Sequence, residues 1–143
     1  MQSDARTAED AILQLSLAVG RRLRARLDGD PVEWSQATLL FTLKRRGALR
    51  LGDLAESMRL DASTVSRHVQ QLADRELISR EPDPVDGRAC ILAITDAGRA
   101  ALTTTFDHRR SILTEALADW DDTERERLRD DLVRLNGSLG ALP

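Results

Sequence analysis

The fold is decided by residues 51–98, LGDLAESMRLDASTVSRHVQQLADRELISREPDPVDGRACILAITDAG. Two short helical patterns, 51–58 and 62 to about 75, are separated by only three residues, and this spacing predicts a helix-turn-helix. Strand-like runs at 77–80 and 90–94 follow, and the segment between them is rich in proline and glycine, which predicts a β-hairpin. A hairpin directly behind a helix-turn-helix is a wing. The sequence therefore predicts a mainly α protein with a small β-hairpin wing (α+β), a winged helix-turn-helix.

The second helix of this pair carries two faces of different chemistry, because residues follow one another at about 100° around a helix. The apolar side holds Ala62, Val65, Val69 and Leu72. The polar side and its flanks supply the candidate DNA-reading residues Ser63, Thr64, Ser66, Arg67 and Gln70. Short hydroxyls let a helix backbone approach the major groove, while Arg and Gln reach donors and acceptors on base edges. The alternative is an ordinary amphipathic surface helix capped by Asp61. His68 lies between the two faces, where packing or a phosphate contact would suit it.

The wing is expected to present Arg88 at the tip of a stiff loop, because Pro82, Pro84 and Gly87 favour a tight turn. This loop would place Arg88 beside the recognition helix, where the negative potential of a narrow minor groove attracts a guanidinium. We expect Asp86 to fix the direction of Arg88 through a bidentate ion pair. The alternative is a solvated hairpin tip with unrelated charges.

The second strand of the hairpin contains the chain's single cysteine. Cys90, Leu92 and Ile94 alternate along the strand and so share one face of it. We therefore expect Cys90 to be a small core residue rather than a reactive thiol.

Residues 51–98 resemble the winged helix-turn-helix of the MarR (multiple-antibiotic-resistance regulator) transcription factors. The resemblance rests on STVSRHVQQL, on the Asp-x-Arg wing of Asp86 and Arg88, and on the strand closing with Ile94 and Thr95 before Gly98. The family usually has Leu where Ile94 stands. The resemblance implies a homodimeric regulator of double-stranded operator DNA that responds to a small, often aromatic or phenolic, ligand. Trp34 and Arg22 are weak candidates for the ligand pocket, since core packing and a solvated face explain them equally well.

Helical patterns flank this segment on both sides. Thr7 is placed to cap a first helix that ends at Gly29, and Ser35 to cap a second helix that runs to about Arg46. After Thr95, a long helix and a last one starting at Asp121 carry two apolar stripes. The stripes consist of Leu102, Phe106, Leu113, Leu117 and Trp120, and of Leu128, Leu132, Leu135 and Leu139.

These stripes exceed what a winged-helix core can cover. We expect residues 1–34 and 96–143 to form a helical dimerisation region and residues 35–95 to form the DNA-binding domain. An intramolecular three-helix bundle is the alternative. A two-fold dimer would place two recognition helices in successive major grooves, which implies a roughly palindromic site.

Composition bounds the remaining functions. The net charge of −3 hides a gradient, since residues 44–90 carry +1 and residues 91–143 carry −3. One cysteine and two widely spaced histidines predict neither a metal site nor a disulfide, and no pattern predicts catalysis or a cofactor. No apolar run is long enough for a membrane span and the first residues do not resemble a signal peptide, so we expect a cytoplasmic protein. A winged helix that binds protein instead of DNA remains the alternative function; Arg67, Asp86 and Arg88 argue against it.

Overall fold

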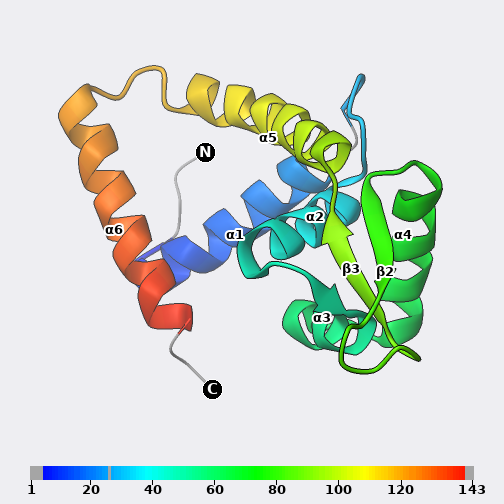
Figure 1. The fold of residues 1–143 in the computed structure, drawn as a ribbon. Coiled ribbons are helices and arrows are strands. Elements are labelled where there is room, and N and C mark those ends of the chain that lie inside the picture. The colour runs from blue at the N-terminus through cyan, green and yellow to red at the C-terminus, as the bar shows by residue number, and fades with distance from the viewer. Residues whose placement is uncertain (1–4, 26, 141–143) are drawn as a thin grey trace. The chain divides into compact units, whose positions relative to one another are not determined.

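The computed structural model describes residues 5–25 and 27–140 and divides into two units, which meet within one long helix at residues 108 and 109. The first unit begins with α1 (Ala8–Arg24), α2 (Trp34–Arg46), β1 (Leu49–Arg50), α3 (Leu51–Met58) and α4 (Ala62–Asp74). It continues with β2 (Ile78–Pro82), β3 (Cys90–Ile94) and the first part of α5 (Asp96–Ala116). The second unit holds the rest of α5 and α6 (Asp122–Gly140) (Figure 1). This order of elements confirms a mainly α winged helix-turn-helix.

The first two helices begin and end differently from the expectation in part. The Thr7 hydroxyl accepts the Asp10 N–H at 3.2 Å, so the predicted cap of α1 is confirmed. However, α1 ends at Arg24 instead of reaching Gly29. A turn follows, in which the Asp30 carboxylate accepts the Leu27 N–H at 3.1 Å and so competes with further helix.

The N-cap of α2 is Glu33, not Ser35, so that helix starts earlier than expected. The Gln36 side chain accepts the Glu33 N–H at 3.3 Å and satisfies a backbone group at the start of the helix. The predicted end of α2 is correct, because Gly47 follows Arg46 with a positive φ of 82°, which glycine adopts without strain.

The wing is part of a three-stranded sheet in the order β1-β3-β2. The β2–β3 hairpin is antiparallel, with Ile78 opposite Ile94 and Pro82 opposite Cys90, and it confirms the predicted hairpin. Strand β1 was not expected, because two residues are too short to produce a strand pattern in a sequence. Its pairing of Leu49 with Leu92 attaches the wing to the segment that leads directly into α3.

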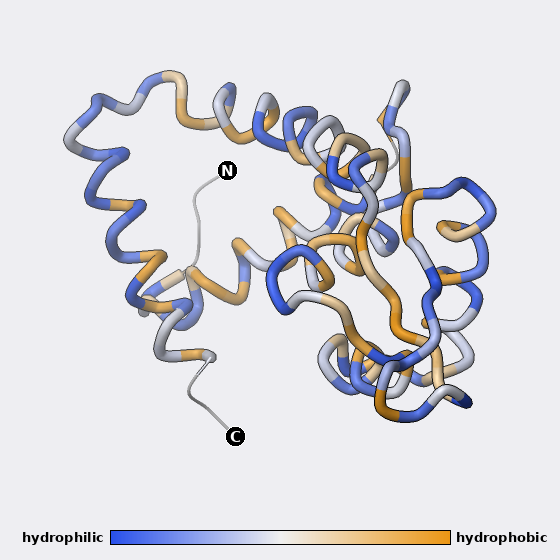
Figure 2. The backbone as a smooth tube through the Cα atoms, in the orientation of Figure 1, coloured by the Kyte–Doolittle hydropathy of each residue, from blue (hydrophilic) through white to orange (hydrophobic). Residues whose placement is uncertain are grey.

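The core of the first unit lies between α2, α3, α4, the sheet and the start of α5. Its largest fully buried side chains are Leu39, Leu40, Leu43, Leu54, Leu72, Leu102, Val65 and Thr105. The helix-turn-helix and wing elements show alternating apolar and polar stretches along the backbone (Figure 2). Burying one Leu side chain contributes about 1.5–3 kcal/mol, so this cluster is sufficient to hold the recognition helix against the sheet.

The start of α5 is fixed by Thr95 and Gly98. The Thr95 hydroxyl donates to the Glu76 carbonyl at 2.7 Å and accepts the Gly98 N–H at 3.0 Å, as an N-cap side chain does. A Cβ at Gly98 would lie 2.1 Å from the Leu77 carbonyl oxygen. Glycine is therefore required where α5 passes the backbone behind the recognition helix.

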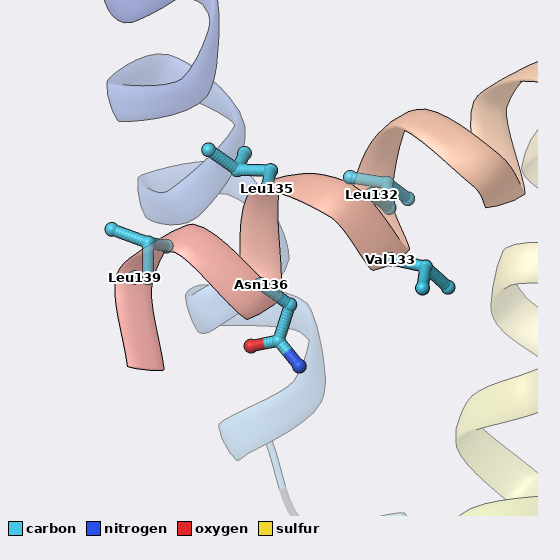
Figure 3. Close-up of a pocket in the computed structure, with 5 residues that line it drawn as sticks. All are labelled: Leu132, Val133, Leu135, Asn136 and Leu139. Atoms are coloured by element: carbon cyan, nitrogen blue, oxygen red, sulfur yellow. The ribbon is translucent and has the colours of Figure 1, made fainter. Parts of the chain in front are cut away.

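The second unit exposes an apolar surface. Asp121 and Glu124 each accept the other's backbone N–H at 2.9 Å, which confirms that this pair begins the last helix. No described residue of α6 is buried. A pocket on this helix is lined by Leu132, Val133, Leu135, Asn136 and Leu139 (Figure 3).

Helix α5 ends at Ala116, so the expected stripe through Leu117 and Trp120 leaves the helix before its end. Across the described part of the chain, no helix has the length and apolar character needed to cross a membrane.

Candidate DNA-binding interface

The turn between α3 and α4 sets the orientation of the candidate recognition helix. Arg59 adopts a left-handed conformation with φ 52°, and the Leu60 N–H donates to the Ala55 carbonyl at 3.1 Å. These bonds close the end of α3 within one residue of the next helix. Asp61 then caps α4, because its carboxylate accepts the Thr64 N–H at 2.8 Å.

The first turn of α4 holds its hydroxyls in a fixed arrangement. Asp61 also accepts the Ser63 hydroxyl at 2.5 Å and the Thr64 hydroxyl at 2.8 Å. These bonds, that of Ser63 first and those of Thr64 after it, lower the pKa of Asp61 to about 2 from its ordinary 3.8. Ser63 and Thr64 therefore point their protons at Asp61, and their lone pairs remain available as acceptors.

The middle of α4 separates packing residues from exposed ones. Ser66 and Arg67 are exposed, while Val65, His68 and Val69 are buried. Burial makes His68 a packing residue and excludes the expected option of a phosphate contact. Within the described residues, neither the Arg67 guanidinium nor that of Arg88 has a hydrogen-bond or ion-pair partner. Both cations are thus available to an external anion.

Gln70, by contrast, has both ends of its side chain engaged. Its Nε2 donates to Asp74 at 2.7 Å, and its Oε1 accepts an N–H of Arg80 at 3.0 Å. Asp74 lies one turn further along α4, and Arg80 comes from β2. Sequence reasoning missed Arg80, because nothing in the local pattern indicates that a strand residue reaches the helix face.

The base of the wing is held by a second residue that sequence reasoning missed. Asp83 is buried at the start of the loop, where its carboxylate pairs with the Arg50 guanidinium and accepts the Val85 N–H at 2.8 Å. The Val85 bond, with a further contribution from Arg50, lowers the pKa of Asp83. Because Arg50 is the N-cap of α3, this pair joins the wing to the helix-turn-helix.

Two expectations about the wing are wrong in detail. Asp86 accepts the backbone N–H of Arg88 at 3.1 Å, so it shapes the turn and forms no ion pair with that guanidinium. An Asp side chain that binds the N–H two residues ahead closes a local turn. Cys90 is exposed, not a core residue, because β3 begins near the wing tip before its alternate face reaches the core at Leu92.

The two weak ligand candidates lie on different helices. Trp34, at the start of α2, is partly buried, and its ring centroid lies 5.6 Å from that of Phe106. Arg22 is exposed on α1. The described residues contain no group of three His, Cys, Asp or Glu side chains that could hold a metal ion.

Comparisons with known proteins agree with this geometry. The MarR family model matches residues 32–90. An uncharacterized HTH-type transcriptional regulator of Mycobacterium bovis is 36% identical over 132 residues, which cover 90% of each chain. The uncharacterized HTH-type regulator YxaD of Bacillus subtilis is 37% identical over 105 residues, covering 73% of each chain. The HTH-type transcriptional repressor MdtR of the same species is 30% identical over 66% of this chain and 60% of its own.

Solved structures match over nearly the whole chain. Apo MarR of E. coli superposes with a TM-score of 0.79 at 16% identity, covering 92% of this chain and 98% of that one. A probable transcriptional regulator from Pseudomonas aeruginosa superposes with a TM-score of 0.64 at 31% identity over 91% and 97%. Family, relatives and fold point to the same conclusion, and the chain belongs to the MarR family of DNA-binding transcriptional regulators.

Proposed function

We propose that this regulator is a ligand-responsive repressor that binds a pseudo-palindromic operator as a homodimer. In this proposal Ser63, Thr64, Ser66 and Arg67 contact the major groove, with Gln70 in the same surface, and Arg88 enters the minor groove. Asp86 supports Arg88 by shaping its turn. The observation that carries the assignment is the free state of the Arg67 and Arg88 guanidiniums on the recognition helix and on the wing. Exposed arginines of this kind bind phosphates and base edges.

Exposed apolar side chains on the terminal helices support the homodimer. On α1, Leu13 and Leu17 are 65% and 68% exposed, and on α6 Val133 is 66% exposed. The pocket on α6 is lined mainly by leucine and valine (Figure 3). Apolar surfaces of this kind mark protein contacts, and two-fold symmetry is the commonest way to cover them in a homo-oligomer. The proposed dimerisation region comprises residues 1–34 and 96–143, and the DNA-binding domain comprises 35–95.

Aromatic side chains between α2 and α5 support a small aromatic or phenolic ligand. The Phe106 ring lies 5.6 Å from Trp34 and 5.5 Å from Phe41, which is 38% exposed. The Arg45 guanidinium lies 5.8 Å from the Phe41 ring centroid. Rings with a nearby cation suit a flat anionic molecule. A ligand there would act by changing the spacing of the two recognition helices.

Operator binding is tested with a duplex that the protein selects from a random pool, measured by fluorescence anisotropy beside a scrambled duplex. Arg67→Ala is expected to weaken operator binding by about 1–3 kcal/mol and to relax preference at one base position in each half-site. Arg88→Ala is expected to lower affinity by a similar amount and to flatten A·T preference at the outer flanks. If both variants bind the operator as the wild type does, the proposed interface is wrong.

A further inference from the structure

The side chain of Gln70 is held at both ends inside the molecule. Its amide N–H donates to Asp74 at 2.7 Å, and its carbonyl accepts an N–H of Arg80 at 3.0 Å. A glutamine reads adenine by donating and accepting at the same time, and that contact needs both ends of the amide. In this conformation Gln70 does not offer such a pair to a base.

The contact with Gln70 brings an arginine from the wing strand onto the recognition-helix face. Arg80 lies on β2 and is exposed, yet its guanidinium meets a side chain of the outer face of α4. A guanidinium has five N–H donors, and Gln70 takes one or two of them. No carboxylate of the described residues forms an ion pair with Arg80, whereas Arg50 is neutralised by Asp83. Arg80 therefore presents an oriented, uncompensated positive charge.

The position of this charge along α4 indicates what it meets. Gln70 lies seven residues beyond Ser63, which is about 10 Å along a helix. The first residues of a recognition helix contact base edges, and the major groove is about 12 Å wide. A group some 10 Å further along the face therefore lies at the rim of the groove, where the phosphates are. Arginine donors at that place bind phosphate oxygens.

We propose that Arg80 binds a backbone phosphate at the rim of the major groove and that Gln70 is the positioning residue that holds it there. The inference rests on the proposed DNA interface and deepens it, since it changes the role of Gln70 from reading a base to orienting an arginine. Asp74 completes the arrangement by fixing the amide of Gln70 from the other side.

The first test compares Arg80→Ala with Arg99→Ala, which removes the same charge from an exposed position on α5, outside the helix-turn-helix and the wing. Both are titrated against the selected operator and a scrambled duplex over a range of salt concentrations. Arg80→Ala should weaken both complexes by a similar factor, on the order of tenfold at low salt, and should reduce the salt slope by about 0.9 for each phosphate that is no longer neutralised. Arg99→Ala should bind as the wild type does.

The second test is a double-mutant cycle of Gln70→Ala and Arg80→Ala. If Gln70 acts through Arg80, the double variant should bind no more weakly than Arg80→Ala alone. Gln70→Ala should also lower the affinity for every single-base-pair variant of the operator by one common factor. Additive losses, or a changed preference at one base position in Gln70→Ala, would overturn the positioning role.

Circular dichroism confirms that each variant is folded before binding is measured. An Arg80→Ala protein that binds with wild-type affinity and salt slope, while Arg67→Ala and Arg88→Ala are impaired, refutes this inference and leaves the proposed function intact. If all three arginine variants bind as the wild type does, the proposed DNA interface itself fails.

Discussion

At the residue scale, side chains that fix the backbone matter as much as side chains that face DNA. Thr95, Gly98 and Asp61 contact no predicted partner molecule, yet they set where α4 and α5 begin. Loss of such residues acts on folding, whereas loss of Arg67 or Arg88 is expected to act on binding alone. This difference makes separate measurements of stability and affinity informative.

Gly98→Ala is expected to destabilise the protein by about 1–3 kcal/mol or more, because the added methyl group collides with the Leu77 carbonyl and with Ile94. Urea denaturation measures the free energy of unfolding. Gly52→Ala is the matched control, since a Cβ at that position of α3 has no neighbour within 4 Å. Equal stability of the two variants would mean that α5 shifts freely away from Leu77.

Asp61 is expected to remain ionised in acid well below its ordinary pKa. Its pKa is lowered in the folded state to about 2, so its stabilising effect is present above pH 3.8 and is lost as the pH falls through about 2. NMR titration of the carboxyl carbons measures this directly. Ser63→Ala removes the largest cause and should raise the pKa of Asp61 towards 3.8. A Ser63→Ala protein with an unchanged Asp61 titration would contradict the arrangement of the first turn.

At the element scale, the sequence predicts what repeats along the chain and misses what is made by contact between distant segments. The helix-turn-helix, the hairpin and the capping pair of Asp121 and Glu124 have local patterns, and all three are present. The two-residue strand β1 has no pattern of its own, and its existence depends on β3. Cys90 alternates correctly with Leu92, but alternation does not tell where along a strand the core ends.

The candidate site follows the same rule. Exposure of Ser66 and Arg67 follows from helical period, which is readable in the sequence. The Arg50–Asp83 pair and the contact of Arg80 with Gln70 join residues 33 and 10 positions apart, and no periodicity encodes them. The ion pair expected between Asp86 and Arg88 is absent because Asp86 binds the nearer backbone N–H instead.

Asp83→Ala is expected to weaken operator binding by about 1–2 kcal/mol although it removes a negative charge from a DNA-binding domain. The buried Asp83 carboxylate holds both Arg50 and the wing turn, so its loss frees the loop that carries Arg88. Fluorescence anisotropy at fixed salt measures the effect. Glu81→Ala, which removes an exposed charge from the neighbouring strand, should bind equally well or more tightly. Tighter binding by Asp83→Ala would show that charge, not wing position, dominates.

At the scale of the whole molecule, the terminal helices carry apolar side chains that their own units leave exposed. Leu132 and Leu139 are 45% and 54% exposed on α6, and α1 has no buried residue. A second copy of the chain is the proposed partner of these surfaces. The proposal gives each operator half-site one recognition helix and makes affinity depend on protein concentration.

Sedimentation velocity at micromolar concentration is expected to show a dimer, and Leu132→Glu should shift it towards monomer by placing a charge in the apolar surface. Ser138→Glu adds the same charge to an exposed position of α6 that does not line the pocket, and should remain dimeric. Deletion of residues 121–143 should leave monomeric or insoluble chain. A monomeric wild-type protein at this concentration would refute the proposed assembly.

The pairing of β1 with β3 has a consequence for the rates of DNA binding. Because Leu49 pairs with Leu92 and Arg50 with Ile91, the wing is hydrogen-bonded to the residues that lead into α3, and the two DNA-reading parts are assembled before any encounter. A surface that needs no ordering step binds at a rate set by diffusion and charge, so operator mutations should leave association almost unchanged. They should instead shorten the lifetime of the complex, so that a regulated promoter is distinguished by how long the protein stays there.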